Sequence, residues 1–431
     1  MPFFDQAVET MPRAQLNALQ HQKLRTMLEG IWERNAFYTA KLKAAHLAPD
    51  DLRSLDDLRR LPFTTKHEIV GDQLAHPPFG TNLSYPIQAY IRFHQTSGTT
   101  GVPFRVLDTE ESWDWWGRCW AHVLSGAGVT NEDRVFEAFS FGPFIGFWAS
   151  VDGARQIGAM MIPGGGRDSQ QRLELMRDTG VTALCCTPTY ALRLAEVARE
   201  NGFDLRQIPV RATIHAGEPG ANIPATKKRI EEAWNAKCYD HAGASEVGAH
   251  SFECAAQPGG THVIESEFIV EVINPRTGEI LPTGERGELV ITNLGRWGFP
   301  VIRYRTGDLV EVNLNECVCG RTFARFEGGI VGRADDMVTV RGVNVFPSAV
   351  ENIIRRYQEV DEFRVTVSAV REMDEMDVEI ELSNGANAAL ADSIAQAIDT
   401  ALSFRPNVRV VERDTLPRFE LKAKRFHVKR E

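Results

Sequence analysis

Short apolar runs alternate with amphipathic stretches through the middle of the chain. Residues 181–186 and 211–215 are short and largely apolar, which is typical of buried strands. The stretches 169–179, 190–201 and 223–237 have the composition and punctuation of helices. This alternation of strands and helices predicts an α/β fold in which helices cover a mostly parallel sheet.

Two glycine-containing loops follow predicted strands in this region. Residues 216–220 follow the strand at 211–215, and residues 242–246 follow a short strand predicted at 238–241. Parallel α/β sheets bind their ligands beyond the carboxyl ends of the strands. We therefore expect both loops to lie at a binding site.

The pattern differs on either side of this region. Residues 15–44 are rich in helix, because Leu24, Leu28 and Ile31 recur at helical spacing. After about residue 268, strand-like runs separated by turns predict a β-rich subdomain, residues 268–332.

A further change near residue 332 indicates a domain boundary. From there to residue 431, strands mix with two helices, predicted at 347–357 and 388–403. We therefore predict a large N-terminal domain, residues 1–332, and a small mobile α+β domain, residues 333–431.

One loop concentrates hydroxyl groups and glycine after an apolar, strand-like segment. It consists of Thr96, Ser97, Gly98, Thr99, Thr100 and Gly101. Glycine lets the backbone approach a ligand closely, and the hydroxyl groups add hydrogen-bond donors. The loop suits a phosphate chain, although a solvated turn can have the same composition. It is not a Walker A loop, because the Gly-Lys-Ser/Thr ending is missing.

Composition and charge argue against several classes of protein. The chain has 431 residues, of which 43% are hydrophobic and 25% charged, and its formal net charge is −10. That charge argues against a nucleic acid or an anionic membrane as partner. No apolar run approaches the roughly 20 residues of a membrane helix. The N-terminal segment is no signal peptide and the seven cysteines are scattered, so we expect a cytoplasmic protein with reduced thiols.

Charged motifs occur at three places in the second half of the chain. A strand predicted at 301–304 runs into a turn that carries Asp308, whose carboxylate could accept hydrogen bonds from vicinal hydroxyls such as those of a ribose. Residues 332–336, at the predicted domain boundary, suit a hinge. Residues 417–425 form a basic, extended tail that includes Lys422 and Lys424. Each motif alone is also compatible with an ordinary turn, linker or solvated end.

Four possible metal ligands lie in the second half of the N-terminal domain. They are Cys254, His262, Cys317 and Cys319. Three thiols and one imidazole suit a closed tetrahedral zinc site, and four protein ligands leave no open position for catalysis. The alternative is a set of unlinked thiols and a histidine.

In this order, the motifs resemble those of the adenylate-forming superfamily, and most closely the phenylacetate-CoA ligase family. That family has segments similar to residues 184–192, 300–306 and 341–348. The resemblance runs from about residue 23 to residue 425. It implies an ATP-dependent, AMP-forming ligase that uses Mg²⁺ and coenzyme A, and a homodimer. Some phenylacetate-CoA-ligase-like proteins also carry a structural zinc at positions that match the four ligands above.

The resemblance also implies roles for individual residues. The loop from Thr96 to Gly101 would hold the β and γ phosphates of ATP. Glu246, after Ser245, would help to hold Mg²⁺, and Asp308 would bind the ribose with Arg333 nearby. The adenine and acyl sites would be lined by Ala216, Gly217, Glu218, Pro219, Asp240, His241, Ala242 and Gly243.

The small domain would supply the catalytic lysine. Asp335 would be the hinge, and Lys422 would reach the α-phosphate and the carboxylate, with Lys424 as the alternative. Ala242 stands where the family usually has an aromatic residue against adenine, and His241 or Tyr239 could take that part.

The expected acid is aromatic and hydrophobic. Phe136, Phe141 and Phe144 lie in the region that forms the aryl pocket in the family, and no cation there awaits a second carboxylate. Phenylacetate, indoleacetate and a benzoate are the candidate substrates. Two further hypotheses are an enzyme that loads an aryl acid onto a carrier protein, and a non-catalytic binder of nucleotide or acyl group.

Overall fold

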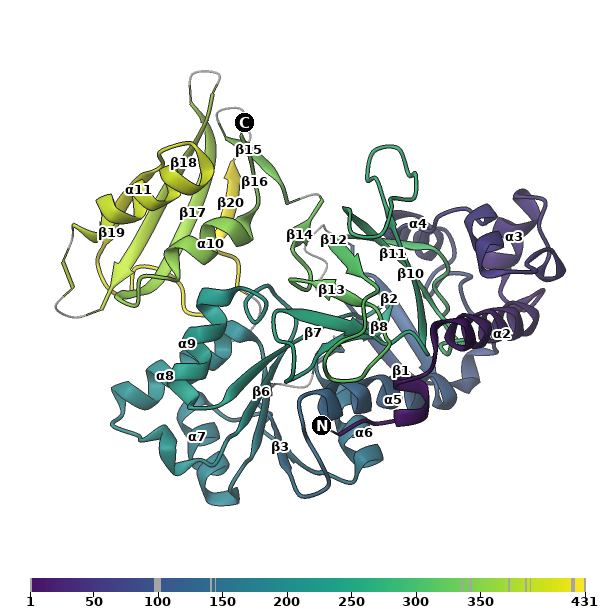
Figure 1. Ribbon diagram of the computed structural model, residues 1–431, viewed down its shortest axis with the longest axis horizontal. Helices are drawn as coiled ribbons and strands as arrows, with labels where there is room; N and C mark the ends of the chain where they lie inside the picture. Colours follow the sequence, from purple (N-terminus) through teal and green to yellow (C-terminus); the bar gives the residue numbers. More distant parts are fainter. Residues whose placement is uncertain are drawn as a thin grey trace.

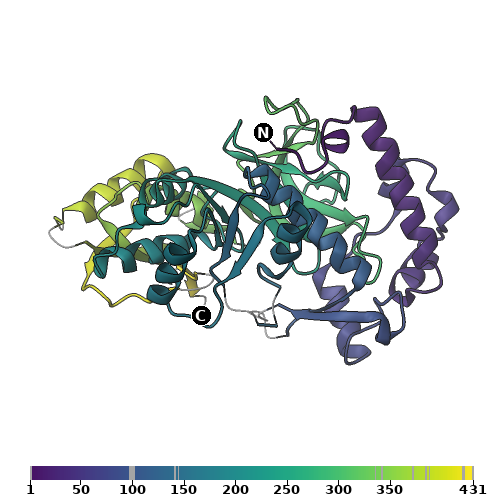
Figure 2. The same ribbon diagram turned by 90° about the horizontal axis from the view of Figure 1, so that it is seen from below.

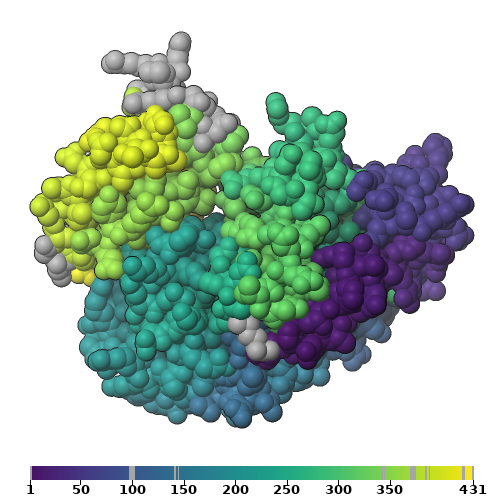
Figure 3. All heavy atoms as spheres, viewed as in Figure 1, coloured from purple at the N-terminus to yellow at the C-terminus, as the bar shows by residue number. Residues whose placement is uncertain are grey.

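The computed structural model has a large N-terminal part and a small C-terminal domain that lie side by side (Figures 1 and 2). It describes residues 2–96, 102–139, 142–143, 145–334, 336–340, 343–370, 373–383, 386–387, 389–419 and 423–429. In Figure 3 the C-terminal domain sits at one end of the molecule and the N-terminal helices at the other.

A parallel sheet forms the centre of the N-terminal part. Its strand order is β4–β3–β5–β6–β7, and all four neighbouring pairs are parallel. The bounds are β3 Arg134–Glu137, β4 Met160–Pro163, β5 Ala183–Cys186, β6 Ala212–His215 and β7 Lys237–Ala244. The short apolar runs thus form the buried strands that their composition predicts.

Helices cover both faces of these strands. Successive strand residues point to opposite faces of the sheet, so each strand contributes buried side chains to the core on either side. On one face, α5 (Glu110–Gly126) and α6 (Trp148–Ile157) share a core with Val135 and Ile214. On the other, α7 (Ser169–Thr179), α8 (Pro188–Glu200) and α9 (Pro224–Trp234) share a core with Phe136 and Leu184. A three-residue 3₁₀ helix, Leu205–Gln207, lies between α8 and β6.

The same sheet continues as antiparallel strands in the order β7–β8–β9–β13–β12–β11–β10, and β14 pairs with β12. The bounds are β8 Gly248–Glu253, β9 Gly260–Val263, β10 Phe268–Ile273, β11 Arg286–Asn293, β12 Tyr304–Asn313, β13 Arg325–Glu327 and β14 Gly332–Arg333. The predicted β-rich region is therefore an extension of the central sheet.

The N-terminal helices precede the sheet in the chain, and part of them packs against the far edge of this extension. They are α1 (Gln6–Glu9), α2 (Arg13–Ile31), α3 (Ala36–Ala44) and α4 (Lys66–Ala75), with 3₁₀ helices at Pro49–Asp51, Leu55–Arg60 and Ile87–Ala89. Leu24, Leu28 and Ile31 of α2 share a core with Ile269 and Leu294, which confirms the helical pattern. Strands β1 (Tyr90–Gln95) and β2 (Arg105–Thr109) form an antiparallel hairpin around the hydroxyl-rich loop.

The C-terminal domain is a four-stranded sheet with two helices, α10 (Pro347–Ile354) and α11 (Leu390–Leu402). Its order is β19 (Asn407–Val411), β18 (Met373–Leu382), β17 (Val360–Val370) and β20 (Phe426–Lys429). A hairpin of β15 (Val338–Val340) and β16 (Val343–Val345) connects it to the N-terminal part. The predicted fold class, a large helix-covered α/β part and a small α+β domain, is confirmed.

Two local predictions are wrong. The strand predicted at 301–304 begins only at Tyr304, and Asp308 lies inside β12 and not on a turn after a strand. The pairing of β12 with β11 shifts register here, and Gly307 has a φ of 77°, so a bulge interrupts a strand that continues to Asn313. The loop predicted at 242–246 begins inside β7, which continues to Ala244, so Ala242 and Gly243 are strand residues. Directly after the basic tail, residues 426–429 form β20. No helix in the described residues is long and apolar enough to cross a membrane.

Candidate active site

The predicted site loops meet at one edge of the parallel strands. The loop at residues 216–220 follows β6, and the segment Ala242–Glu246 lies at the end of β7, the neighbouring parallel strand. Their carboxyl ends point the same way, so the two predicted binding segments lie together, as expected. Thr96 directly follows β1, and its backbone N–H donates to Phe104 O, just before β2, at 2.9 Å.

Glu218 connects this loop with two other parts of the chain. One carboxylate oxygen accepts the backbone N–H of Thr189 at 2.9 Å, and the other accepts that of Ala423 at 2.6 Å. Thr189 lies in the first turn of α8, where a carboxylate also interacts favourably with the helix dipole. Gly217 has a φ of 94°, a conformation that favours glycine over any residue with a side chain.

Asp240 and His241 lie within β7, where His241 is buried and Asp240 is half-buried. Burial, together with the nearby charge of Glu253, raises the pKa of Asp240 to about 7. Burial lowers the pKa of His241 to about 4, so its ring is neutral at neutral pH. Its Nδ1 lies 2.8 Å from the carbonyl oxygen of Ser251, which can only accept, so Nδ1 carries the proton.

An aromatic wall surrounds His241 on the α5–α6 face of the sheet. The ring of Trp120 contacts the imidazole at a centroid distance of 4.6 Å. Phe147 lies 5.5 Å from Trp120, and Phe139 lies 5.5 Å from Phe147. All four rings are uncharged and buried, so the wall makes the surroundings of His241 apolar.

Phe136 does not belong to this wall. Its side chain is fully buried on the opposite face, in the core with α7 and α8. A Cβ added at Gly164 would lie 2.6 Å from the Phe136 ring, so the phenyl group is tightly enclosed. The structure therefore places Phe136 in the core, away from His241.

Ser245 and Glu246 are held by residues that the sequence analysis did not identify. The Tyr304 hydroxyl donates to a carboxylate oxygen of Glu246 at 2.8 Å. Arg296 donates to the backbone oxygen of Ser245 at 2.7 Å and forms a two-point pair with Asp108 at 2.6 and 2.7 Å. The Arg296 and Asp108 side chains are fully buried, so this pair fixes the loop from inside the protein.

Asp308 and Arg333 come together as their proposed roles require. They are directly paired residues of β12 and β14, and Arg333 Nη1 lies 3.1 Å from Asp308 Oδ1. Arg333 is 43% exposed and Asp308 is 23% exposed, so both side chains are accessible to a ligand.

Several predicted site residues lie outside the described residues, and their roles stay predictions. They are Ser97, Gly98, Thr99, Thr100, Gly101, Phe141, Phe144, Asp335 and Lys422. Lys424, the alternative to Lys422, is exposed. Ala216 and Pro219 lie on the loop after β6, and Ala242 and Gly243 lie near the end of β7, where they pair with β8. A Cβ at Gly243 would lie 2.9 Å from Gly248 O, so a side chain has no room there.

The four predicted metal ligands converge. The ligand atoms of Cys254, His262, Cys317 and Cys319 all lie within 4.8 Å of one another. Cys254 Sγ and Cys317 Sγ are 3.7 Å apart, and Cys319 Sγ lies 3.5 Å from His262 Nε2. Tetrahedral zinc with ordinary bond lengths requires separations of about 3.7 Å between sulfurs and about 3.5 Å between sulfur and nitrogen. The residues therefore fit a metal ion.

The surroundings of His262 favour the same arrangement. Its Nδ1 donates to the carbonyl oxygen of Phe323 at 3.2 Å, which leaves Nε2 free to bind a metal. The cluster could hold a metal ion in a closed set of four ligands.

Known protein families match both the N-terminal part and the C-terminal domain of this chain. Residues 89–295 match the AMP-binding enzyme family, and residues 342–430 match the AMP-binding enzyme C-terminal domain. The phenylacetate-coenzyme A ligase of Thermus thermophilus is 34% identical over 379 residues, 87% of this chain and 83% of the relative. That of Escherichia coli is 33% identical over 427 residues, 96% of this chain and 95% of the relative.

The chain belongs to the phenylacetate-CoA ligase family. It is an AMP-forming acid–CoA ligase, with ATP and CoA as the substrates of this class. This agrees with the hypothesis of a CoA ligase and argues against a non-catalytic binder.

Solved structures of a related ligase show which arrangement of the two domains this chain adopts. 2-Hydroxyisobutyryl-CoA ligase in the postadenylation state with 2-HIB-AMP superposes with a TM-score of 0.93, at 31% identity, over 98% of this chain and 92% of that one. The same ligase in the thioesterification state, with CoA, gives 0.75 over 99% of this chain and 92% of that one. The coverage is nearly the same in both comparisons, so the lower score reflects a different domain arrangement. This phenylacetate-CoA ligase family member thus adopts the arrangement of the postadenylation state.

Proposed function

We propose that this protein is an aryl-acid CoA ligase whose substrate is phenylacetate or a closely related aromatic acid. The observation that carries the proposal is the apolar surrounding of neutral His241, which packs with the buried, uncharged rings of Trp120, Phe147 and Phe139. The wall adjoins Ala242 and Gly243, where the acyl site is expected. The full-length similarity to phenylacetate-CoA ligases supports the same substrate class.

In the first half-reaction, a carboxylate oxygen of the acid attacks the α-phosphorus of ATP. An acyl-adenylate forms and pyrophosphate leaves. Negative charge accumulates on phosphate oxygens in the transition state, so cationic groups aimed at them lower the barrier. Lys422 would supply such a charge, and Asp308 would hold the ribose hydroxyls.

Mg²⁺ fits at Glu246. Its carboxylate already accepts the Tyr304 hydroxyl with one oxygen, and its other oxygen can act as a hard ligand of the kind that Mg²⁺ prefers. The ion would neutralise charge on the phosphates of ATP. Arg296 would keep the Ser245–Glu246 loop in place through the Ser245 carbonyl.

In the second half-reaction, the CoA thiolate attacks the acyl carbon and AMP leaves. This step needs access for the thiol, so the C-terminal domain would rotate and withdraw Lys422. The enzyme would then release an aryl-CoA thioester and AMP.

Product analysis tests the proposal. The protein is incubated with ATP, Mg²⁺ and one acid at a time: phenylacetate, indoleacetate, benzoate or 2-hydroxyisobutyrate, each with and without CoA. We expect AMP, pyrophosphate and an aryl-CoA thioester from an aromatic acid. Exclusive use of 2-hydroxyisobutyrate would overturn the aromatic assignment. Release of an adenylate that CoA cannot consume would favour the carrier-protein alternative.

We also propose that Cys254, His262, Cys317 and Cys319 hold a structural zinc ion. The ligand separations of 3.7 and 3.5 Å support it, and so does the hydrogen bond from His262 Nδ1 to the Phe323 carbonyl, which orients the imidazole. Four protein ligands leave no open position, so this zinc would stabilise the loop between β12 and β13 without taking part in the reaction.

A further inference from the structure

Glu218 lies on the N-terminal part but bonds to the C-terminal tail. The loop that carries it follows β6, yet its second carboxylate oxygen accepts the N–H of Ala423, the residue directly after Lys422. Its first oxygen is held by the N–H of Thr189 in α8. A carboxylate with both oxygens bonded to backbone N–H groups fixes the distance between those two backbones.

A second contact reinforces the same junction. Arg425 Nη1 donates to the hydroxyl of Thr189 at 3.1 Å, and its other side pairs with Glu362 of β17 at 3.0 Å. Burial alone would lower the pKa of Arg425, but the charges of Glu362, Glu351 and Glu218 raise it. Thr189 therefore donates its backbone N–H to Glu218 and accepts a hydrogen bond from Arg425 with its hydroxyl group.

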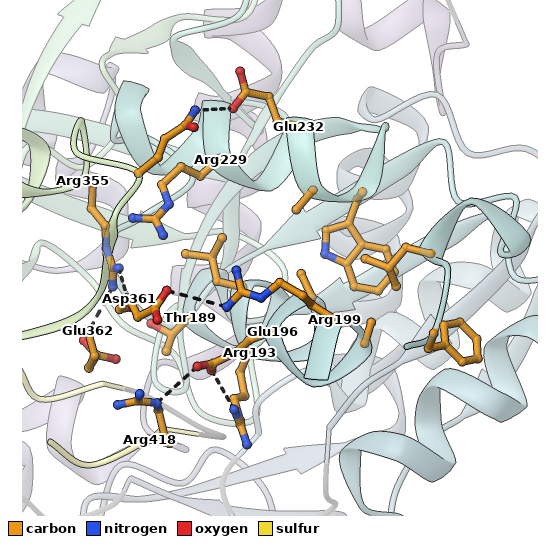
Figure 4. Close-up of a pocket in the computed structure, with 18 of the residues that line it drawn as sticks. Thr189, Arg193, Glu196, Arg199, Arg229, Glu232, Arg355, Asp361, Glu362 and Arg418 are labelled. Carbon is orange, nitrogen blue, oxygen red and sulfur yellow. Dashed lines mark hydrogen bonds and ion pairs between the residues drawn. The ribbon is translucent and has the colours of Figure 1, made fainter. Parts of the chain in front are cut away.

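The junction borders the groove between the two domains. Figure 4 shows Thr189, a residue of α8, beside Arg355, Asp361 and Glu362 of the C-terminal domain. Other contacts across this groove include the ion pair of Arg418 with Glu196 at 3.6 Å and the hydrogen bond of Gln358 to Glu232 at 3.2 Å. Among the described contacts, the Glu218 bond lies nearest in the chain to Lys422.

We propose that Glu218 is the positioning residue of the catalytic-lysine segment in the first half-reaction. Its carboxylate anchors the backbone beside Lys422 in the arrangement that this structure shares with the postadenylation state. The anchor joins the two domains, so their rotation for thioester formation must break it. The proposed role of the Glu218 carboxylate differs from lining the adenine site. The inference rests on the proposed function.

The test compares the variants E218A and E218Q with the wild type in separate half-reactions. Adenylate formation is measured by ATP–pyrophosphate exchange without CoA, and thioester formation by consumption of a presynthesised phenylacetyl-adenylate. E218A should slow exchange on the order of ten- to a hundred-fold, the usual effect of losing a charged hydrogen bond. The KM for ATP and thioester formation should stay within about twofold. E218Q retains one acceptor oxygen, so its exchange rate should be intermediate.

The control is E232Q, which alters another carboxylate at the domain junction but not the tail segment. It should leave both half-reactions unchanged. An E218A variant with wild-type exchange would overturn the proposal. A raised KM for ATP at unchanged turnover would also overturn it and favour the adenine-lining role. An equal loss of rate in both half-reactions, together with a lower Tm, would indicate that Glu218 has only a structural role.

A measurement that needs no substrate separates this inference from the proposed function. Hydrogen exchange of the Ala423 amide should be faster in E218A than in the wild type, because that N–H loses its acceptor. Unchanged exchange at Ala423 would overturn the anchor even if the enzyme is active. Failure of the wild type on every aromatic acid would instead contradict the proposed function. The exchange rate of the Ala423 amide would then still decide whether Glu218 anchors the tail.

Discussion

At the residue scale, the site depends on buried charges that the sequence did not reveal. Asp308 and Arg333 could be predicted as partners, since both belong to motifs with a known spacing in the family. The bond of Tyr304 to Glu246 and the pair of Arg296 with Asp108 join residues far apart in the chain. No local pattern marks such partners, because the fold alone brings them together.

Loss of Arg296 should destabilise the protein strongly. In the variant R296M the Asp108 carboxylate would be buried without its two-point partner, at a cost of about 3–5 kcal/mol in the free energy of unfolding. Chemical denaturation of both proteins measures this change. The exposed pair of Arg206 with Asp204 supplies the control R206M, whose stability should be nearly unchanged. Equal stability of R296M and the wild type would contradict the buried-pair interpretation.

Glu137 should make stability depend on pH. Burial raises its pKa to about 8, and hydrogen bonds from Ser150 and Cys185 only partly offset this. Between the unfolded pKa, near 4.5, and about 8, the folded state keeps a proton that the unfolded state loses. Stability therefore falls as pH rises through this window.

The variant E137Q removes that titration. Its Tm relative to the wild type should rise from about pH 5 to about pH 8 and then stay level. The exposed Glu132 gives the control E132Q, for which the difference in Tm should not vary with pH. A difference in Tm for E137Q that is the same at every pH would show that Glu137 is ionised in the folded protein.

At the element scale, the buried strands and the helices between them could be predicted, because their composition and punctuation are local. Strand β20 could not, since a basic segment becomes a strand only by pairing with β17. The bulge in β12 could not be predicted either, for a similar reason. Thr306, Gly307 and Asp308 have the composition of a turn, and only the continued pairing with β11 shows that the strand goes on.

Zinc should stabilise the segment between β12 and β13. Protein purified without chelator should contain close to one zinc ion per chain, and C319S should contain much less. Removal of zinc should lower Tm on the order of 5–10 °C, as expected for loss of a tightly bound ligand. The control C119S changes a buried cysteine of α5, outside the cluster, and should keep its metal. Metal-free wild-type protein with an unchanged Tm would contradict the zinc site.

At the scale of the whole molecule, the sequence predicted the fold class but not the arrangement of the domains. Ion pairs and hydrogen bonds across the groove, such as those of Arg425 and Gln358, connect residues whose encounter depends on that arrangement. The boundary at residue 332, the hinge at Asp335 and the homodimer stay predictions. The mass of the protein in solution would decide the homodimer.

The central claim is that an aromatic acid is activated through its adenylate. The most direct test uses phenylacetate labelled with heavy oxygen in its carboxylate, together with ATP, Mg²⁺ and CoA. Attack of the carboxylate on the α-phosphorus transfers one labelled oxygen to AMP, so mass spectrometry should find labelled AMP together with phenylacetyl-CoA. Unlabelled AMP, or label in phosphate or pyrophosphate, would contradict the account.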